Sequence, residues 1–574
     1  MDGWVKNVAR PVADPLHPGV TVPGALAGDR TPGNEEYSGR LALVWRPSED
    51  FSADLRLLYS SQEINTYTAF IEPYCTGGVT QPTVLGNPDL QADCRKDRRK
   101  SEGSLAPVFA RNYTYGNNGV PHFSSGAFLG SLTLEKQFGD ISVTSITGVY
   151  DQSFWGTNNA DYSSFAAFWG AQNEDYNLFT QEVRLNTDFD GKLNFSAGAY
   201  YETFDREFGN YPSILHAGLN VAADNYTSFE TVAQAEGNTL SAFGQVRWQI
   251  ADGLELAAGA RYSRDEKSQD AVNRTVGVTS LALRPAGSVL SSTFEDENVS
   301  PEATLSWKFA PRQMVYAGYK SGYKAGAISN GALLTASATS DSLVVGSEVA
   351  DGFEVGYKGD MLANRLRLNA VAYSYDFEDL QLGTLNAATL SFIIQNAAAA
   401  RTQGFTGSLA WLATDRLTLN GNVGYNRARY TRFTDAQCYT FQTAAQGCVG
   451  GRQDLTGEQL TRAPELSAML GFNYVAPLWS DWQADISGSA AYTSDYQTAS
   501  DNDPGGLQDS FTKINAAVHI GPQDGRFQLS VIGRNLTDEY VLVGSSARPL
   551  GGQGQYVGVF NRPREVVLQV KFTF

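Results

Sequence analysis

The feature that most constrains this chain is the strict alternation of apolar and polar residues along its predicted strands. Residues 240–250 alternate in this way, and so do residues 51–60 and the final residues 565–574. Because successive side chains of a β-strand point to opposite faces, this period places the apolar side chains on one face. The sequence therefore predicts strands with one apolar and one polar face.

The connections between the predicted strands are of two kinds, which alternate along the chain. Short turns rich in Gly, Pro, Asn and Asp occur at 46–50, 138–140, 189–191, 251–253, 309–311, 362–364, 413–415, 476–478 and 521–524. Long loops occur at about 8–37, 62–125, 154–174, 206–237, 267–293, 324–350, 381–391, 432–461, 496–510 and 537–561. Membrane barrels have short turns on the periplasmic side and long loops outside. The pattern predicts an all-β, antiparallel transmembrane barrel that forms a single domain over residues 1–574.

The number of predicted strands favours a large barrel. About 19 strands are predicted from Tyr37 to Phe574, and the outward-running stub at 4–8 adds part of one more, which gives about 19–20. Barrels of about 22 strands have the size of plugged transporters. The chain starts without a basic segment, an apolar segment or a small-residue cleavage site, so no signal peptide is predicted. We therefore expect an N-terminally truncated barrel of the 22-stranded type, which lacks two strands and part of a third.

Composition excludes several classes of protein. The net charge is −18, from 43 Lys and Arg against 61 Asp and Glu, which argues against nucleic acid as a partner. Charged residues are only 18% of the chain, whereas soluble proteins carry about 25%. The sequence contains no apolar run of about 18 residues, so no transmembrane helix is predicted. The four His residues are isolated and no catalytic Ser/His/Asp arrangement stands out, so we expect no enzyme, no cofactor and no metal site.

The end of the chain carries the most specific motif. Residues 533–540 read Gly-Arg-Asn-Leu-Thr-Asp-Glu-Tyr, and after a loop come Arg-Pro-Arg-Glu at 562–565 and a last strand that ends in Phe574. This arrangement resembles the C-terminal signature of TonB-dependent receptors of Gram-negative outer membranes, and segments 315–324 and 353–358 are also similar to that family. The signature residues are Arg534, Asn535, Leu536, Tyr540, Pro563, Arg564 and Phe574.

The resemblance implies a function. It implies a multi-pass barrel in the Gram-negative cell outer membrane that takes up a scarce ligand by TonB-coupled active transport, with a ferric siderophore as the default substrate. Vitamin B12, haem, nickel chelates and carbohydrates remain alternative ligands. The implied partners are outer-membrane lipid, lipopolysaccharide, the barrel-assembly machinery and, if a plug is supplied, the TonB complex. The family's plug domain is not found in this sequence, so the alternatives are a plugless or passive pore and a non-functional truncated receptor.

Four cysteines form two local pairs in the predicted loops. Cys75 and Cys94 share one long loop, and Cys438 and Cys448 share another. Outside the cell, such pairs favour two disulfides over a metal site, for which the spacing is too wide. The alternative is four free thiols.

Three sets of loop and strand residues are candidates for ligand contact. Aromatic residues of the loops suit aryl-bearing ligands or glycans, or else pack the loops together; they are Tyr67, Tyr74, Tyr113, Trp155, Trp169 and Tyr211. The basic run 95–100 could bind lipopolysaccharide phosphates or form a solvated loop tip. Arg184, Arg247, Arg261 and Arg367 lie on the polar face, where they either line the path of an anionic ligand, contact a plug or pair with nearby carboxylates.

Overall fold

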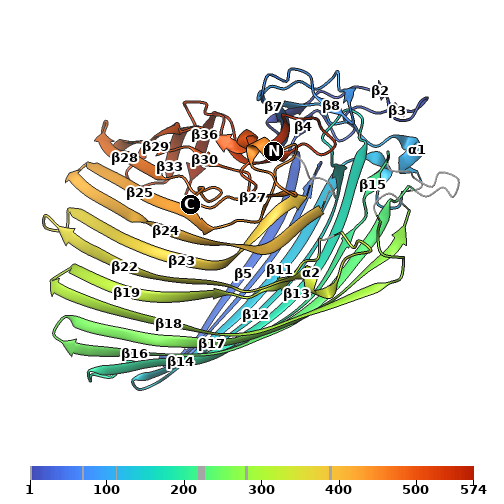
Figure 1. Cartoon of the computed structure of the whole chain (residues 1–574). Coiled ribbons are helices and arrows are strands. Elements are labelled where there is room, and N and C mark those ends of the chain that lie inside the picture. The colour runs from blue at the N-terminus through green and yellow to red at the C-terminus, as the bar shows by residue number, and fades with distance from the viewer. Residues whose placement is uncertain are drawn as a thin grey trace.

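Long antiparallel strands form one curved wall in the computed structural model of the chain, which describes residues 3–66, 70–111, 113–216, 226–277, 282–331, 333–386 and 391–573 (Figure 1). The wall strands are β5 (Asn34–Ser48), β6 (Phe51–Ile64), β11 (His122–Phe138), β12 (Ile141–Asn159), β13 (Phe168–Thr187), β14 (Leu193–Asn210), β16 (Phe229–Ala251), β17 (Leu254–Val276), β18 (Val289–Ala310), β19 (Gln313–Lys324), β22 (Glu348–Met361), β23 (Leu366–Asn386), β24 (Ser391–Thr414), β25 (Leu417–Arg432), β28 (Leu466–Pro477), β29 (Trp482–Thr493), β32 (Phe511–Pro522), β33 (Phe527–Arg534) and β36 (Glu565–Phe572). The short β15 (Ser213–Ile214) pairs with the outer part of β13. The predicted fold class is confirmed.

All nine predicted short turns join neighbouring strands of the wall. For example, β16 ends at Ala251 and β17 begins at Leu254, and the two strands pair along their whole length. Because every second connection is a short turn, one rim of the wall carries only short turns and the other carries the long loops. We call these rims the short-turn end and the long-loop end.

Each strand has an apolar outer face and a more polar inner face. In β16 the outer side chains Leu240, Val246 and Trp248 are exposed, while Ser241 lies on the inner face and is buried. Several strands continue past this apolar band toward the long-loop end, where the outer row becomes acidic at Glu236, Glu266 and Glu295. An apolar band around a polar interior is the pattern of a transmembrane barrel. No helix among the described residues is long and apolar enough to cross a membrane.

One junction of the wall differs from the others. The strand order places β36 beside β5 and so completes the circle. Residue-by-residue pairing runs from β5 round the wall to β36, but within the described residues no paired positions join these two strands. Both strands run toward the short-turn end. In β5 the consecutive residues Leu43 and Val44, which lie on opposite faces of the strand, are both exposed.

The long-loop end is covered by a folded cap, which comprises the described parts of segments 3–33, 65–121, 160–167, 211–228 and 535–564 and the outer ends of the strands that they join (Figure 1). Within the cap, we call segment 65–121 the first long loop and segment 535–564 the last. The predicted outward stub at 4–8 belongs to this cap and not to the wall. Its residues form β1 (Val5–Asn7), which pairs with β10 (Arg99–Lys100) and β4 (Arg30–Thr31) in a separate sheet. The prediction was wrong because an alternating segment this short pairs equally well with loop strands.

The cap, and not the wall, contains the largest apolar core among the described residues. Trp169, Phe109 and Val22 pack together there with other buried side chains from the described parts of 105–113, 166–171 and 211–232. A second sheet joins β7 (Ile71–Cys75) of the first long loop to β35 (Gln555–Phe560) and β34 (Leu542–Ala547) of the last. Loops that are distant in sequence therefore form one packed unit above the lumen wall.

Candidate ligand vestibule and lumen

Most of the aromatic ligand candidates lie inside the cap and hold it together. Tyr74, Tyr113, Trp169 and Tyr211 are only 1%, 2%, 0% and 4% exposed. The Tyr74 hydroxyl donates to the carbonyl of Gly505 at 2.8 Å, and the Tyr113 hydroxyl donates to the carbonyl of Tyr211. These side chains are therefore packed against protein rather than turned toward a ligand.

The two tryptophans in the candidate set lie on strands, not in a loop. Trp155 belongs to β12 and Trp169 to β13, because this hairpin extends well beyond the apolar band. Trp155 is half-buried, and its ring lies 5.4 Å from that of His122 on β11. Tyr67 lies outside the described residues.

A wholly buried ion pair joins the first and last long loops of the cap. Arg548 Nη2 lies 3.2 Å from Asp89 Oδ2, and both side chains are completely buried. Arg548 also donates to the carbonyls of Asp161 and Tyr162 in the loop between β12 and β13, and Ser164 donates to Asp89. We call these residues the cap latch. Sequence reasoning missed the latch because Asp89 and Arg548 are 459 positions apart.

The basic run at 95–100 is partly built into the cap and partly exposed. Lys100 is buried and binds Glu102 at 2.9 Å. Arg98 binds Asp538 at 2.9 Å and packs on the ring of Tyr540, and the ammonium of Lys96 lies 4.9 Å from the ring centroid of Tyr74. Arg98 and Lys100 are therefore paired within the protein, whereas Arg95 and Arg99 are exposed.

Residues of the C-terminal motif fold as a clamp between β33 and β36. The Asn535 side chain accepts the amide of Glu539 at 3.0 Å and donates to the carbonyl of Arg562 at 3.2 Å. Asp538 accepts the amide of Arg564, next to Pro563, at 3.0 Å. Beside the clamp, the amide of Leu536 donates to the carbonyl of Ile514, and Arg534 Nη1 lies 3.8 Å from Glu565. Phe574 lies outside the described residues.

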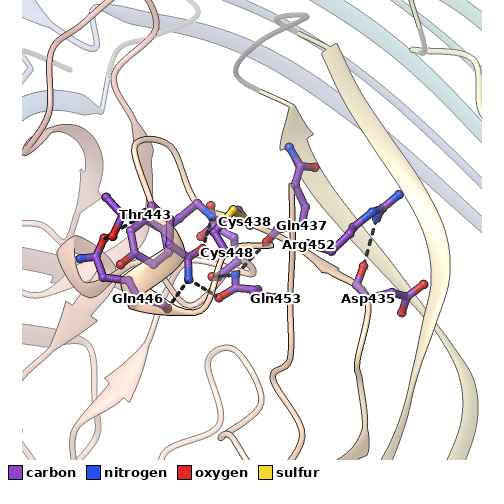
Figure 2. The surroundings of a disulfide bond; sticks show 11 residues. Asp435, Gln437, Cys438, Thr443, Gln446, Cys448, Arg452 and Gln453 are labelled. Atoms are coloured by element: carbon purple, nitrogen blue, oxygen red, sulfur yellow. Dashed lines mark hydrogen bonds between the residues drawn. A yellow bond between two sulfur atoms is a disulfide. The ribbon is translucent and has the colours of Figure 1, made fainter. Parts of the chain in front are cut away.

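Both cysteine pairs form disulfides, Cys75 with Cys94 and Cys438 with Cys448. Figure 2 shows the second, at the tip of the long loop between β25 and β28. This loop also contains the two short paired strands β26 (Ala436–Gln437) and β27 (Arg452–Gln453). Thr443 and Gln446 close its tip, because the Thr443 amide donates to Gln446 Oε1 at 2.9 Å. The disulfide thus closes a loop that already has its own hydrogen bonds.

The four candidate arginines of the lumen wall have different partners. Arg184 binds Glu182, and Arg367 binds Asp360 at 2.8 Å, as expected for mutual pairing. Arg247 donates to the backbone carbonyl of Thr187 at 3.3 Å. Arg261 forms no carboxylate ion pair among the described residues.

Arg261 instead lies against aromatic rings in the lumen wall. Its guanidinium lies 5.3 Å from the ring centroid of Tyr200 and 5.7 Å from that of Phe243. Arg184, Gly198, Phe243 and Arg261 lie opposite one another on four adjacent strands. The Phe243 ring occupies the space above Gly198, where a Cβ atom would lie 2.4 Å from it. This row holds a guanidinium in the lumen by stacking rather than by charge pairing.

The barrel family described as "TonB dependent receptor-like, beta-barrel" matches residues 95–536, which is most of the chain. The chain belongs to the TonB-dependent receptor family. The barrel accordingly lies in the Gram-negative outer membrane, with the short-turn end in the periplasm and the capped long-loop end outside.

Solved structures of receptors have the same fold. The ferric yersiniabactin uptake receptor FyuA from Yersinia pestis is 15% identical, with a TM-score of 0.72, over 100% of this chain and 74% of that chain. The siderophore receptor PiuA from Acinetobacter baumannii is 16% identical, with a TM-score of 0.66, over 95% and 76%. The copper transporter OprC is 14% identical, with a TM-score of 0.63, over 96% and 73%. At these identities the likeness establishes the fold and does not select a ligand.

The receptor's described residues offer no ready metal site of their own. Within them, no three His, Cys, Asp or Glu side chains come together in an arrangement that could hold a metal ion. A receptor for a chelated metal does not need such a site, since the chelator already supplies the ligands.

Glu72 should make the cap of this receptor sensitive to pH. Its Oε1 accepts the amides of Asp97 at 2.7 Å and Arg98 at 3.0 Å, and its Oε2 faces the Tyr540 hydroxyl. Burial raises the pKa of the Glu72 carboxyl from 4.5 to about 7. The folded cap holds the Glu72 proton more tightly than the unfolded chain does. The stability that protonated Glu72 contributes to the cap is therefore fully present below pH 4.5 and is lost as the pH rises through about 7.

Hydrogen exchange at the Asp97 and Arg98 amides tests this expectation. Protection, corrected for intrinsic exchange, should fall as the pH rises through that window in the unaltered receptor. Glu72→Gln should flatten the profile, because the amide accepts the same backbone donors and carries no charge at any pH. Glu49→Gln, at an exposed short turn, is the control and should leave the profile unchanged. A flat profile in the unaltered receptor would contradict the assignment.

Proposed function

We propose that this receptor imports a ferric siderophore across the outer membrane by TonB-coupled active transport. Family membership carries the proposal, since it supplies the coupling to TonB. Two features of the chain support it: the long loops form an ordered cap on the outer side, and Arg261 presents an unpaired guanidinium in the lumen. A ferric siderophore with anionic groups would find a complementary charge there.

We propose further that the plug which TonB engages is supplied outside residues 1–574. The family match covers a barrel domain, and the residues at the N-terminus pair with loop strands of the cap. Reading the gene upstream of the Met1 codon tests this point. An in-frame plug and signal peptide would support it, whereas unrelated sequence would mean either that a separate chain supplies the plug or that the chain is a remnant without one.

Uptake in a host without its own siderophore receptors separates the import proposal from its alternatives. Cells that express the complete gene should accumulate radioactive iron from a panel of ferric siderophores, and deletion of TonB should abolish the uptake. Uptake that persists without TonB would identify a passive pore instead. No uptake by a receptor that is correctly inserted in the membrane would indicate either another ligand or a non-functional chain, and growth on the other ligand classes distinguishes these two.

Lipopolysaccharide and the barrel-assembly machinery remain proposed partners. The exposed apolar outer face must be covered by lipid, and the long strands above the apolar band extend to the level of the lipid headgroups.

A further inference from the structure

Four basic side chains line a cavity in the lumen wall beside the short turns. The cavity has a volume of about 480 Å³, and its basic residues are Lys308, Arg312, Lys358 and Arg367. They come from β18, the turn that follows it, β22 and β23. We call this cavity the inner-mouth pocket, because the short-turn end faces the periplasm.

Strand register brings these side chains together on the inner face. Lys358 of β22 lies opposite Met314 of β19 and Asn369 of β23. Arg367 lies opposite Asp360 one row nearer the turn. The residues that alternate with Lys358, such as Val355 and Tyr357, belong to the outer row. The pocket therefore opens into the lumen and not toward lipid.

Charge in the pocket is poorly compensated from within the protein. Asp360 is the carboxylate that lines the cavity, and its Oδ1 is held by Arg367 Nε at 2.8 Å. Among the described residues, Lys308, Arg312 and Lys358 form no ion pair. The Lys358 ammonium lies 5.4 Å from the ring centroid of Tyr316, which fixes its position without neutralising it. Such a cluster is notable in a chain whose net charge is −18.

Like charges that line one cavity repel one another, and a single bound anion with several charges would relieve the repulsion at all of them. We propose that the inner-mouth pocket binds a small multivalent oxyanion, either a polycarboxylate or a di- or polyphosphate. The guanidinium groups offer planar pairs of donors and the ammonium groups offer point charges, which suits carboxylate and phosphate oxygens alike. The site does not depend on which ligand the receptor imports, so it goes beyond the proposed function.

Calorimetric titration of the full chain in detergent micelles tests the site at constant ionic strength. Citrate represents the polycarboxylates and pyrophosphate represents the phosphates. The probe that binds more tightly identifies the class of anion that the pocket prefers. The double variant Lys308→Gln/Lys358→Gln should weaken binding about tenfold or more, because two of the four cations are removed. Arg312→Gln provides a second variant, in a turn rather than on a strand, and should weaken binding in the same direction.

The matched control removes two exposed lysines from the same end of the barrel. Lys192→Gln/Lys571→Gln changes the net charge equally and lies outside the pocket, so its affinity should stay within about twofold of the unaltered receptor. Heat-modifiable gel migration establishes that each variant is folded. Two results would overturn the proposal: equal weakening by the control pair, or failure of both probes to bind the unaltered receptor more tightly than they bind Lys308→Gln/Lys358→Gln.

Discussion

Arg548→Met is expected to destabilise the cap by about 3–5 kcal/mol, because it leaves the Asp89 carboxylate buried without its cation. Hydrogen exchange at the Ser164 amide, which donates to Asp89 at 3.1 Å, reports the loss directly. The wall strands should keep their protection, since the latch lies entirely among the loops. The expected result is thus local opening of the cap in a barrel that remains inserted.

Two further variants make this expectation specific. Adding Asp89→Asn to Arg548→Met should recover part of the loss, because the buried charge is removed while Ser164 keeps an acceptor. Arg526→Met breaks an ion pair with Asp524 that is exposed to solvent, and should change protection little. Equal exchange at Ser164 in Arg548→Met and in the unaltered receptor would show that the latch does not stabilise the cap.

Trp169→Ala should have a comparable effect on stability, about 3–5 kcal/mol, because it empties the centre of the cap's apolar core. Trp169 is completely buried, and its indole nitrogen donates to the Thr157 hydroxyl. Protease cleavage of the loops and hydrogen exchange at residues 163–167 measure the effect.

Trp155→Ala is the matched control, since it removes the same side chain from a half-buried position on the neighbouring strand. It should cost clearly less stability. If Trp169→Ala left the cap intact but weakened ligand binding, the packing role would be wrong and the original hypothesis of a ligand contact would be favoured.

The wall could be predicted from sequence because its determinants are local. Alternation fixes the faces of each strand, and Gly, Pro, Asn and Asp fix the nine short turns. Strand ends at the long-loop rim were predicted less well: residues 381–391 were expected to form a loop, whereas β23 reaches Asn386 and β24 begins at Ser391. In β17 and β18 the outer row becomes acidic beyond the apolar band, at Glu266 and Glu295, so there the apolar alternation stops although backbone pairing continues.

The candidate site could be predicted only in part, for a related reason. Both disulfides join cysteines that are near in sequence, and the structure has the predicted pairing. An aromatic residue in a loop gives the same pattern whether it packs inward, as Tyr113 does, or faces a ligand. Contacts such as Asp89 with Arg548 join segments at opposite ends of the chain, and no local pattern reports them.

The contacts between the first long loop and the C-terminal motif have a consequence for the order of assembly. Arg98 and Glu72 belong to the loop that follows the second wall strand, but their partners Asp538 and Tyr540 lie 440 and 468 positions later. Synthesis therefore delivers this loop long before the residues that complete it. An intermediate that lacks the last hairpin could already form the Cys75–Cys94 disulfide, yet its outer surface would stay unfinished and open to proteases. The first long loop should thus become resistant to protease cleavage only when the final strands are in place. Its resistance therefore reports that insertion of the barrel is complete.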